Sequence, residues 1–158
     1  MANLEVRHAR GVLDTSTLIL LPKLDDPECL PNEPLITAVT LAELSVGPLV
    51  ATSEVERAVR QAHVQQAEAD FDPLPFDAPA ARAFGGVAAS LRRAGRKTRA
   101  RAYDAMIAAT AIAHGLPVYT CNPDDFADIQ GLEVVPVPLP GLTGKAKNQF
   151  GSSEHDGD

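Results

Sequence analysis

Residues 11–22 read GVLDTSTLILLP, and this stretch decides the fold of the chain. Gly11 to Asp14 is a short apolar run that ends in an acid, which is typical of a buried strand. Seven mostly apolar or hydroxyl-bearing residues follow and run to Pro22, so we expect the strand to lead into a helix. A buried strand followed by a helix is the repeating unit of α/β folds with a parallel sheet.

The rest of the chain continues this alternation. The connection at 22–34 is rich in proline and acids and lacks a clean period. Further strands are predicted at 35–37, 116–120 and 133–137, and helices at 40–47, 53–69, 77–94 and 103–114. This order predicts an α/β domain, a three-layer α/β/α sandwich whose mostly parallel central sheet is covered on both faces.

Two of these helices carry specific expectations. Thr40 and Glu43 match a capping box, with Val39 and Leu44 as a hydrophobic staple, so the first of them should begin at Thr40. The helix at 53–69 should be amphipathic, with Ser53-x-x-Glu56 at its start. Its stripe is formed by Val55, Val59, Ala62 and His63.

The composition indicates one soluble domain. The chain has 158 residues, 45% of them hydrophobic, and no apolar stretch approaches the roughly 18–20 residues of a membrane span. Residues 1–10 hold no apolar signal-peptide core, so we expect a cytoplasmic protein with no membrane partner. We divide it into a lead at 1–10, a domain at 11–140 and a disordered tail at 141–158. Cys29 and Cys121 show no C-x-x-C spacing and are expected to be ordinary thiols.

The charges are unevenly distributed. The net charge of −7 argues against nucleic-acid binding through the overall field. However, one short segment concentrates six cations: Arg92, Arg93, Arg96, Lys97, Arg99 and Arg101. This basic cluster is either a solvated helix end and loop or a local patch that contacts a polyanion.

Three acids are expected at the same edge of the sheet. In open parallel sheets, ligands bind beyond the carboxyl ends of the strands. Asp14 ends the first strand, Glu43 lies in the first turn of the helix after the second, and Asp125 lies in the loop after residues 116–120. Each has a purely structural alternative: Asp14 could cap its helix, Glu43 could close its capping box, and Asp125 could be a solvated loop acid.

Asp104 is a fourth acid in an unfavourable place. On a helix it shares a face with Ile107, Ala108 and Ala111, the stripe expected to pack on the sheet. The structural alternative is that its negative charge only stabilises the first turn of the helix, near the positive end of the helix dipole. Four acids at one edge would repel one another, so either their pKa values rise or a divalent cation neutralises them. Carboxylates without histidine or cysteine partners favour Mg²⁺ or Mn²⁺.

At these residues the chain resembles the PIN-domain family and, within it, the VapC-like toxins of toxin–antitoxin pairs. The resemblance covers about residues 11–137. It rests on four segments in order: VLDTS at 12–16, TAVTLAELSVG at 37–47, DAMIAATA at 104–111 and TCNPDDF at 120–126. One departure is the stretch RKTRARAY at 96–103, where relatives often carry an apolar residue and a second glycine.

The resemblance implies an endoribonuclease that requires Mg²⁺ or Mn²⁺, is held inactive by a cognate VapB-like antitoxin, and is commonly a homodimer. Under this hypothesis Asp14, Asp104 and Asp125 hold the metal, and Glu43 completes the catalytic set. The supporting hydrogen bonds would come from Thr15, Ser16, Thr120 and Asn122. The basic cluster would position the RNA backbone without reading bases.

Other classes of protein fit these residues less well. A phosphatase of the haloacid dehalogenase type also begins with a strand-end aspartate, but it needs a second acid two residues later, where this chain has Ser16. A non-catalytic module that binds RNA or a partner through a degenerate site is the alternative left open, and the intact acid set argues against it.

Overall fold

The computed structural model describes residues 8–141 and shows an α/β domain built on four parallel strands. The strands are β1 (Arg10–Leu13), β2 (Glu33–Leu35), β3 (Val118–Thr120) and β4 (Val134–Pro136), in the order β2-β1-β3-β4. The α-helices are α1 (Thr15–Leu20), α2 (Ala38–Val46), α3 (Glu54–Asp70), α4 (Ala78–Arg93) and α5 (Ala102–Ala113). Short 3-10 turns lie at Leu21–Lys23, Pro27–Cys29, Gly47–Val50, Thr98–Arg101 and Pro123–Phe126.

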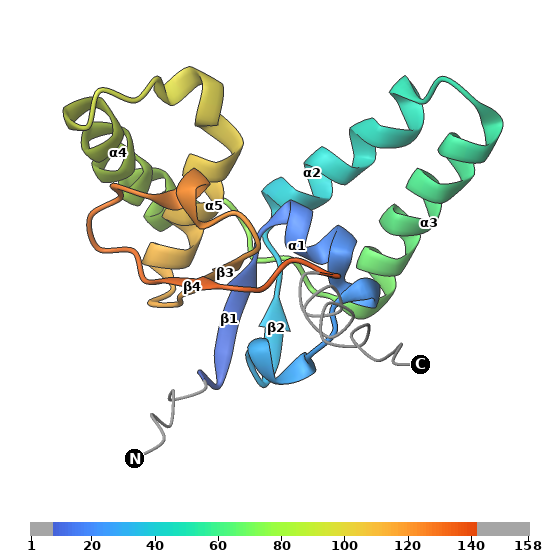
Figure 1. Ribbon diagram of the computed structural model, residues 1–158. Coiled ribbons are helices and arrows are strands. Elements are labelled where there is room, and N and C mark those ends of the chain that lie inside the picture. The colour runs from blue at the N-terminus through green and yellow to red at the C-terminus, as the bar shows by residue number, and fades with distance from the viewer. Residues whose placement is uncertain (1–7, 142–158) are drawn as a thin grey trace, which may run out of the picture.

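The central strand β1 is buried on both faces because successive side chains point to opposite sides of a strand. Val12 packs with Val118 in a core that includes residues of α4 and α5. Leu13 packs with Tyr119 in a second core that reaches α2 and α3. Figure 1 shows these two pairs of helices on opposite sides of the sheet, as the sequence predicted for three layers.

The second strand and the helix after it both begin two residues earlier than expected. β2 ends at Leu35 because the backbone of the next residues turns to residue 74: Leu74 N donates to Ile36 O at 2.9 Å, and Ala38 N donates to Leu74 O at 2.8 Å. Thr37 is extended and its hydroxyl accepts from Thr40 N at 3.2 Å, so Thr37 is the N-cap of α2. The predicted capping box and helix start at Thr40 were wrong.

The helix α3 was placed correctly, but its predicted stripe is not its packing face. Val55 and Val59 are 77% and 52% exposed, whereas Ala67 is buried. In the amino-terminal half of α3 the inward contact is made by a polar residue, Arg60. Its aliphatic stem packs on Gly47, and its Nη1 donates to Gly47 O at 2.9 Å. The exposed valines are therefore available to solvent or to another molecule.

The remaining sequence expectations can be stated briefly. Within the described part of the chain, no helix is long and apolar enough to cross a membrane. Cys29 is half-buried, Cys121 is buried, and neither forms a disulfide among the described residues, in agreement with the expectation of ordinary thiols. Most of the lead at 1–10 and all but the first residue of the tail at 141–158 lie outside the described residues.

Candidate active site

Asp14 lies at the carboxyl end of β1 and is almost fully buried. Its Oδ1 accepts from Thr17 N at 3.2 Å, so it caps α1. Its Oδ2 accepts from the Thr120 hydroxyl at 2.8 Å and from Ser16 Oγ at 3.3 Å. The capping alternative is therefore correct, but it accounts for only one oxygen, and the other is held across the sheet by the end of β3.

Glu43 points back to the start of α1 and does not cap its own helix. Its Oε1 accepts from the Thr15 hydroxyl at 2.8 Å, and Thr40 Oγ1 lies 3.0 Å from the same hydroxyl. Burial raises the pKa of Glu43, the bond from Thr15 lowers it, and the charge of Asp14 raises it further. The capping-box interpretation of Glu43 was wrong. Thr40 was missed as a site residue, although its position one helical turn before Glu43 could have indicated it.

Asp104 lies in the first turn of α5 and is half-buried. Burial, followed by the charges of Asp125, Asp14 and Glu43, raises its pKa to about 6. The charge of Arg101 opposes this rise. The four acids, which are far apart in sequence, thus act on one another electrostatically.

Asp125 lies in the 3-10 turn Pro123–Phe126 after β3. Its Oδ1 is 3.4 Å from Arg101 Nη1, and its backbone N donates to Asn122 O at 3.0 Å. Asn122 continues the network because its N donates to Thr120 Oγ1 at 2.9 Å and its Nδ2 donates to Ser16 Oγ at 3.1 Å. A continuous set of hydrogen bonds therefore links this turn to Asp14.

The donor chemistry fits a hard divalent cation. Carboxylates and hydroxyls are the groups that Mg²⁺ and Mn²⁺ prefer, and Asp104 is a partly desolvated acid that accepts no hydrogen bond from the described residues. Over residues 8–141, however, no three acids, histidines or cysteines are placed to hold one ion together. Direct coordination of one ion by three of the carboxylates would require their side chains to move closer together, whereas water molecules could bridge the longer distances.

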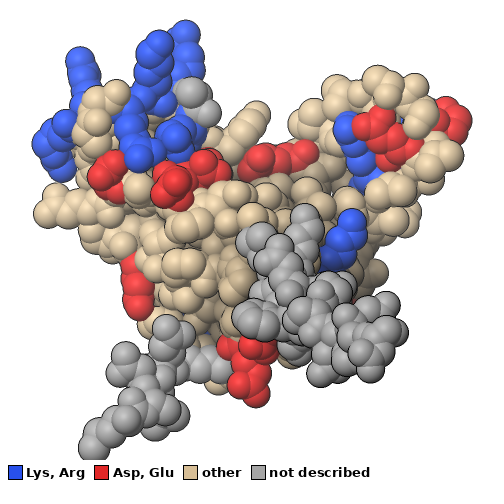
Figure 2. Space-filling view, in the orientation of Figure 1, with Lys and Arg blue, Asp and Glu red and all other residues tan. Residues whose placement is uncertain are grey.

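The basic cluster divides into two groups. Arg96, Arg101 and Arg93 turn toward the protein: Arg96 pairs with Asp128, Arg101 with Asp125, and Arg93 Nη2 lies 3.5 Å from Gln130 Oε1. The other three are exposed and form no ion pair among the described residues: Arg92, Lys97 and Arg99. Figure 2 shows Lys and Arg side chains gathered on the α4 and α5 side of the molecule, directly beside acidic ones.

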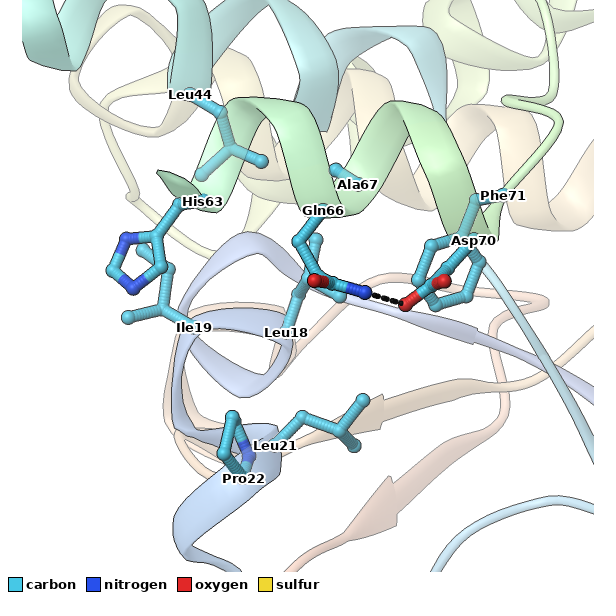
Figure 3. A pocket seen from close by; sticks show the side chains of 10 residues that line it. All are labelled: Leu18, Ile19, Leu21, Pro22, Leu44, His63, Gln66, Ala67, Asp70 and Phe71. Atoms are coloured by element: carbon cyan, nitrogen blue, oxygen red, sulfur yellow. Dashed lines mark hydrogen bonds between the residues drawn. The ribbon is translucent and has the colours of Figure 1, made fainter. Parts of the chain in front are cut away.

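An apolar groove of about 310 Å³ lies between α1 and α3, away from the acids. Figure 3 shows Leu18, Ile19, Leu21 and Pro22 on one side of it and side chains of α3 on the other. None of the acids expected in the active site lines this groove. The helices α1 and α2 nevertheless contribute to both places, since Asp14 caps α1 and Leu44 of the groove follows Glu43.

The fold and the site define an α/β domain with a carboxylate-rich site at the carboxyl edge of a parallel sheet. The family model described as PIN domain matches residues 12–132. The chain belongs to the PIN-domain family.

Named relatives and solved structures agree with this assignment. Ribonuclease VapC5 of Mycobacterium tuberculosis is 40% identical over 131 residues, 82% of this chain and 94% of the relative. Ribonuclease VapC4 of the same organism is 33% identical, over 81% of this chain and 97% of the relative.

A crystal structure of VapBC-5 from Mycobacterium tuberculosis, described as a member of the VapBC family of toxin-antitoxin systems, gives a TM-score of 0.72 at 40% identity. It covers 82% of this chain and 99% of that one. A structure of DNA-bound VapBC from Salmonella typhimurium gives a TM-score of 0.64 at 30% identity. It covers 79% of this chain and 96% of that one. The α/β sandwich predicted from the sequence is thus confirmed by its likeness to solved structures.

Proposed function

We propose that this protein is an endoribonuclease that depends on Mg²⁺ or Mn²⁺ and acts as the toxin of a toxin–antitoxin pair. The observation that carries the proposal is that four acids from distant parts of the sequence meet at the carboxyl edge of the sheet, where burial and the charges of Asp125, Asp14 and Glu43 raise the pKa of Asp104 to about 6. Such repulsion is relieved when a divalent cation binds. The names of the relatives, both Ribonuclease VapC, support RNA as the substrate.

In this proposal Asp14, Asp104 and Asp125 hold the ion, directly or through water, and Glu43 completes the set. A divalent ion held by these residues would supply an activated water for attack on a phosphodiester and would offset negative charge on the leaving oxygen. The carboxylate of Glu43 is oriented by Thr15 and that of Asp14 by Ser16 and Thr120, and Asn122 supports Ser16.

The test compares cleavage of total RNA by the wild type, Asp14→Asn and Asp104→Asn in Mn²⁺ and in EDTA. Both variants should fold and lose activity, and EDTA should inactivate the wild type. Glu68→Gln on the exposed surface of α3 is the matched control and should keep full activity. Undiminished cleavage by either aspartate variant contradicts the mechanism. A wild type that neither binds manganese in calorimetry nor cleaves RNA would support the non-catalytic alternative with a degenerate site.

The exposed cations Arg92, Lys97 and Arg99 are proposed to contact the RNA backbone. Each phosphate contact contributes about 0.7 to the slope of log affinity against log salt for a single strand. Arg99→Gln should therefore weaken RNA binding at low salt and reduce that slope. Arg10→Gln removes a cation at the amino end of β1, far along the sheet from the acids, and should leave the slope unchanged. Equal slopes for both variants would exclude Arg99 from the RNA contact.

The apolar groove between α1 and α3 is proposed to receive an apolar helix of a VapB-like antitoxin. The solved relatives are toxin–antitoxin assemblies by their titles, and a groove lined by leucine, isoleucine and phenylalanine suits helix-in-groove binding. Ile19 is 38% exposed at its edge. Because α1 lines the groove and is capped by Asp14, an occupant of the groove could act on the site through this helix.

Co-purification with the product of a short reading frame beside the gene tests this partner. Ile19→Asp should abolish the complex, whereas Leu139→Asp, which changes a residue of similar exposure outside the groove, should not. A complex that survives Ile19→Asp would place the partner elsewhere. We also propose the cytoplasm as the place of action, because translated RNA is found there.

A homodimer is proposed to form through the end of the α2–α3 hairpin. Its exposed apolar side chains are Val46, Leu49, Val50, Val55 and Val59. The charges nearby are neutralised within α3, where Arg57 pairs with Glu54 and Arg60 with Glu56, so a second acidic copy is not repelled there. Leu49→Asp should yield a monomer by light scattering, and an unchanged mass would refute this surface.

A further inference from the structure

The backbone of Arg96 is hydrogen-bonded to the carboxyl end of α4. Its backbone N donates to Leu91 O at 2.9 Å, and the preceding Gly95 adopts the left-handed conformation with φ +74°. This is the hydrogen-bond pattern that closes a helix through a left-handed residue. Leu91 is buried in the core between α4 and α5, so the backbone of Arg96 is anchored to a well-packed part of the fold.

The Arg96 guanidinium reaches the turn that carries Asp125 and binds it at two points. Its Nε donates to Asp128 Oδ2 at 2.9 Å, and its Nη1 donates to the backbone O of Asp124 at 3.1 Å. These two acceptors flank Asp125 on both sides. The side chain of Arg96 is only 27% exposed, so most of it is used in this contact and little remains for an external ligand.

The turn itself depends on such support. Asp128 has φ +67°, and it is the one non-glycine residue between residues 8 and 141 with a positive φ. This conformation is unfavourable for a residue with a Cβ and persists where surrounding contacts enforce it. Phe126 anchors the turn in the core from the inside, while the contact with Arg96 holds it from the outside.

We propose that Arg96 is a positioning residue for Asp125, holding the turn so that the Asp125 carboxylate faces Asp104, and that it does not contact RNA. This inference rests on the proposed function, because it concerns the geometry of the same site. It assigns Arg96 a different role from the exposed members of the basic cluster, whereas one role was expected for all six cations from their spacing in the sequence.

Arg96→Met keeps the apolar stem and removes both bonds, and Lys97→Met is the matched control, since it removes one adjacent cation with no ion pair. Arg96→Met should weaken Mn²⁺ binding in calorimetry about 10-fold and leave the salt slope of RNA binding unchanged. Lys97→Met should leave Mn²⁺ binding unchanged and reduce the salt slope of RNA binding. Arg96→Lys, which can keep one of the two bonds, should restore part of the Mn²⁺ affinity.

Asp128→Asn tests the same contact from the other side. Asparagine tolerates positive φ, so this variant loses the charge without adding backbone strain. It should also weaken Mn²⁺ binding, and the double variant Arg96→Met with Asp128→Asn should be no weaker than Arg96→Met alone, because both changes remove one contact.

Hydrogen exchange in metal-free protein separates failure of this inference from failure of the proposed function. The amides of Asp125 and Ala127, which close the turn, should exchange faster in Arg96→Met than in Lys97→Met. This result would support the positioning role even if the wild type bound no manganese. Unchanged exchange, or a reduced salt slope with unchanged Mn²⁺ affinity in Arg96→Met, would overturn the inference.

Discussion

Replacing Asp104 by asparagine should make the protein more stable in the absence of metal while it removes activity. The carboxyl of Asp104 is half-buried and faces three acids, which together raise its pKa to about 6 from an ordinary 3.8. A difference of roughly 2 in pKa corresponds to about 3 kcal/mol of unfavourable free energy for the ionised folded state at neutral pH. Because water still reaches part of the side chain and screens its charge, we expect a gain of about 1–2 kcal/mol.

The sign of the pH dependence follows from the raised pKa. Well below its ordinary pKa of 3.8 the carboxyl is protonated in both the folded and the unfolded chain, so it contributes no difference. As the pH rises from there to about 6, the unfolded chain ionises while the folded chain still holds its proton, and stability is lost; above about 6 the loss is complete. Asp104→Asn should therefore exceed the wild type in stability by urea denaturation at pH 7.5 in EDTA, and the gain should be nearly absent at about pH 3, below the ordinary pKa of the carboxyl.

Two controls sharpen this measurement. Glu68→Gln removes an exposed acid from α3 and should change stability by less than about 0.5 kcal/mol at either pH. Added Mn²⁺ should stabilise the wild type more than Asp104→Asn, because ligand binding to the folded state raises its stability. No gain at pH 7.5, or an equal gain at both pH values, would show that Asp104 does not experience the other acids.

Three further substitutions test the packing and the hydrogen bonds around the site. Thr120→Val removes the bond to Asp14 and should cost about 1–3 kcal/mol in urea denaturation and roughly 10–100-fold in RNA cleavage; activity equal to wild type would exclude its supporting role. Gly11→Ala places a Cβ 2.5 Å from Tyr119 Cε2 and should lower stability by about 1–3 kcal/mol. Gly85 lies in the interior of α4, and a Cβ added there has no neighbouring atom within 4 Å. Gly85→Ala should therefore stabilise the protein by about 0.5–1 kcal/mol and raise its melting temperature. A lower melting temperature would show that the new methyl group meets a neighbour.

The sequence predicted the sheet well where a strand ends in a chemically distinctive residue. The apolar run before Asp14 and the strand before Asn122 were placed within one or two residues, and the parallel-sheet rule brought their polar ends to the same edge. The start of α2 was missed because Thr37 and Thr40 are both acceptable N-caps. The contact that decides between them comes from Leu74, which is distant in sequence.

The roles of individual cations could not be predicted from spacing. Arg96 and Lys97 are neighbours in one charged stretch, yet one is bound to the turn of Asp125 and the other faces solvent. Which of them folds back depends on where that turn lies, and this is fixed by the burial of Phe126. Similarly, hydrophobic periodicity placed α3 but not its inner face, because a polar side chain, Arg60, fills the position near Gly47.

The bond between Thr120 and Asp14 has a consequence for protein synthesis. The two residues are separated by 106 positions, so a growing chain carries the first acid long before it carries the hydroxyl that holds it. The strand that supplies this hydroxyl, β3, pairs with β1 and is the third of the four strands to be synthesised, so it joins the sheet late. A ribosome therefore has to release most of the domain from its exit tunnel before the acids can meet.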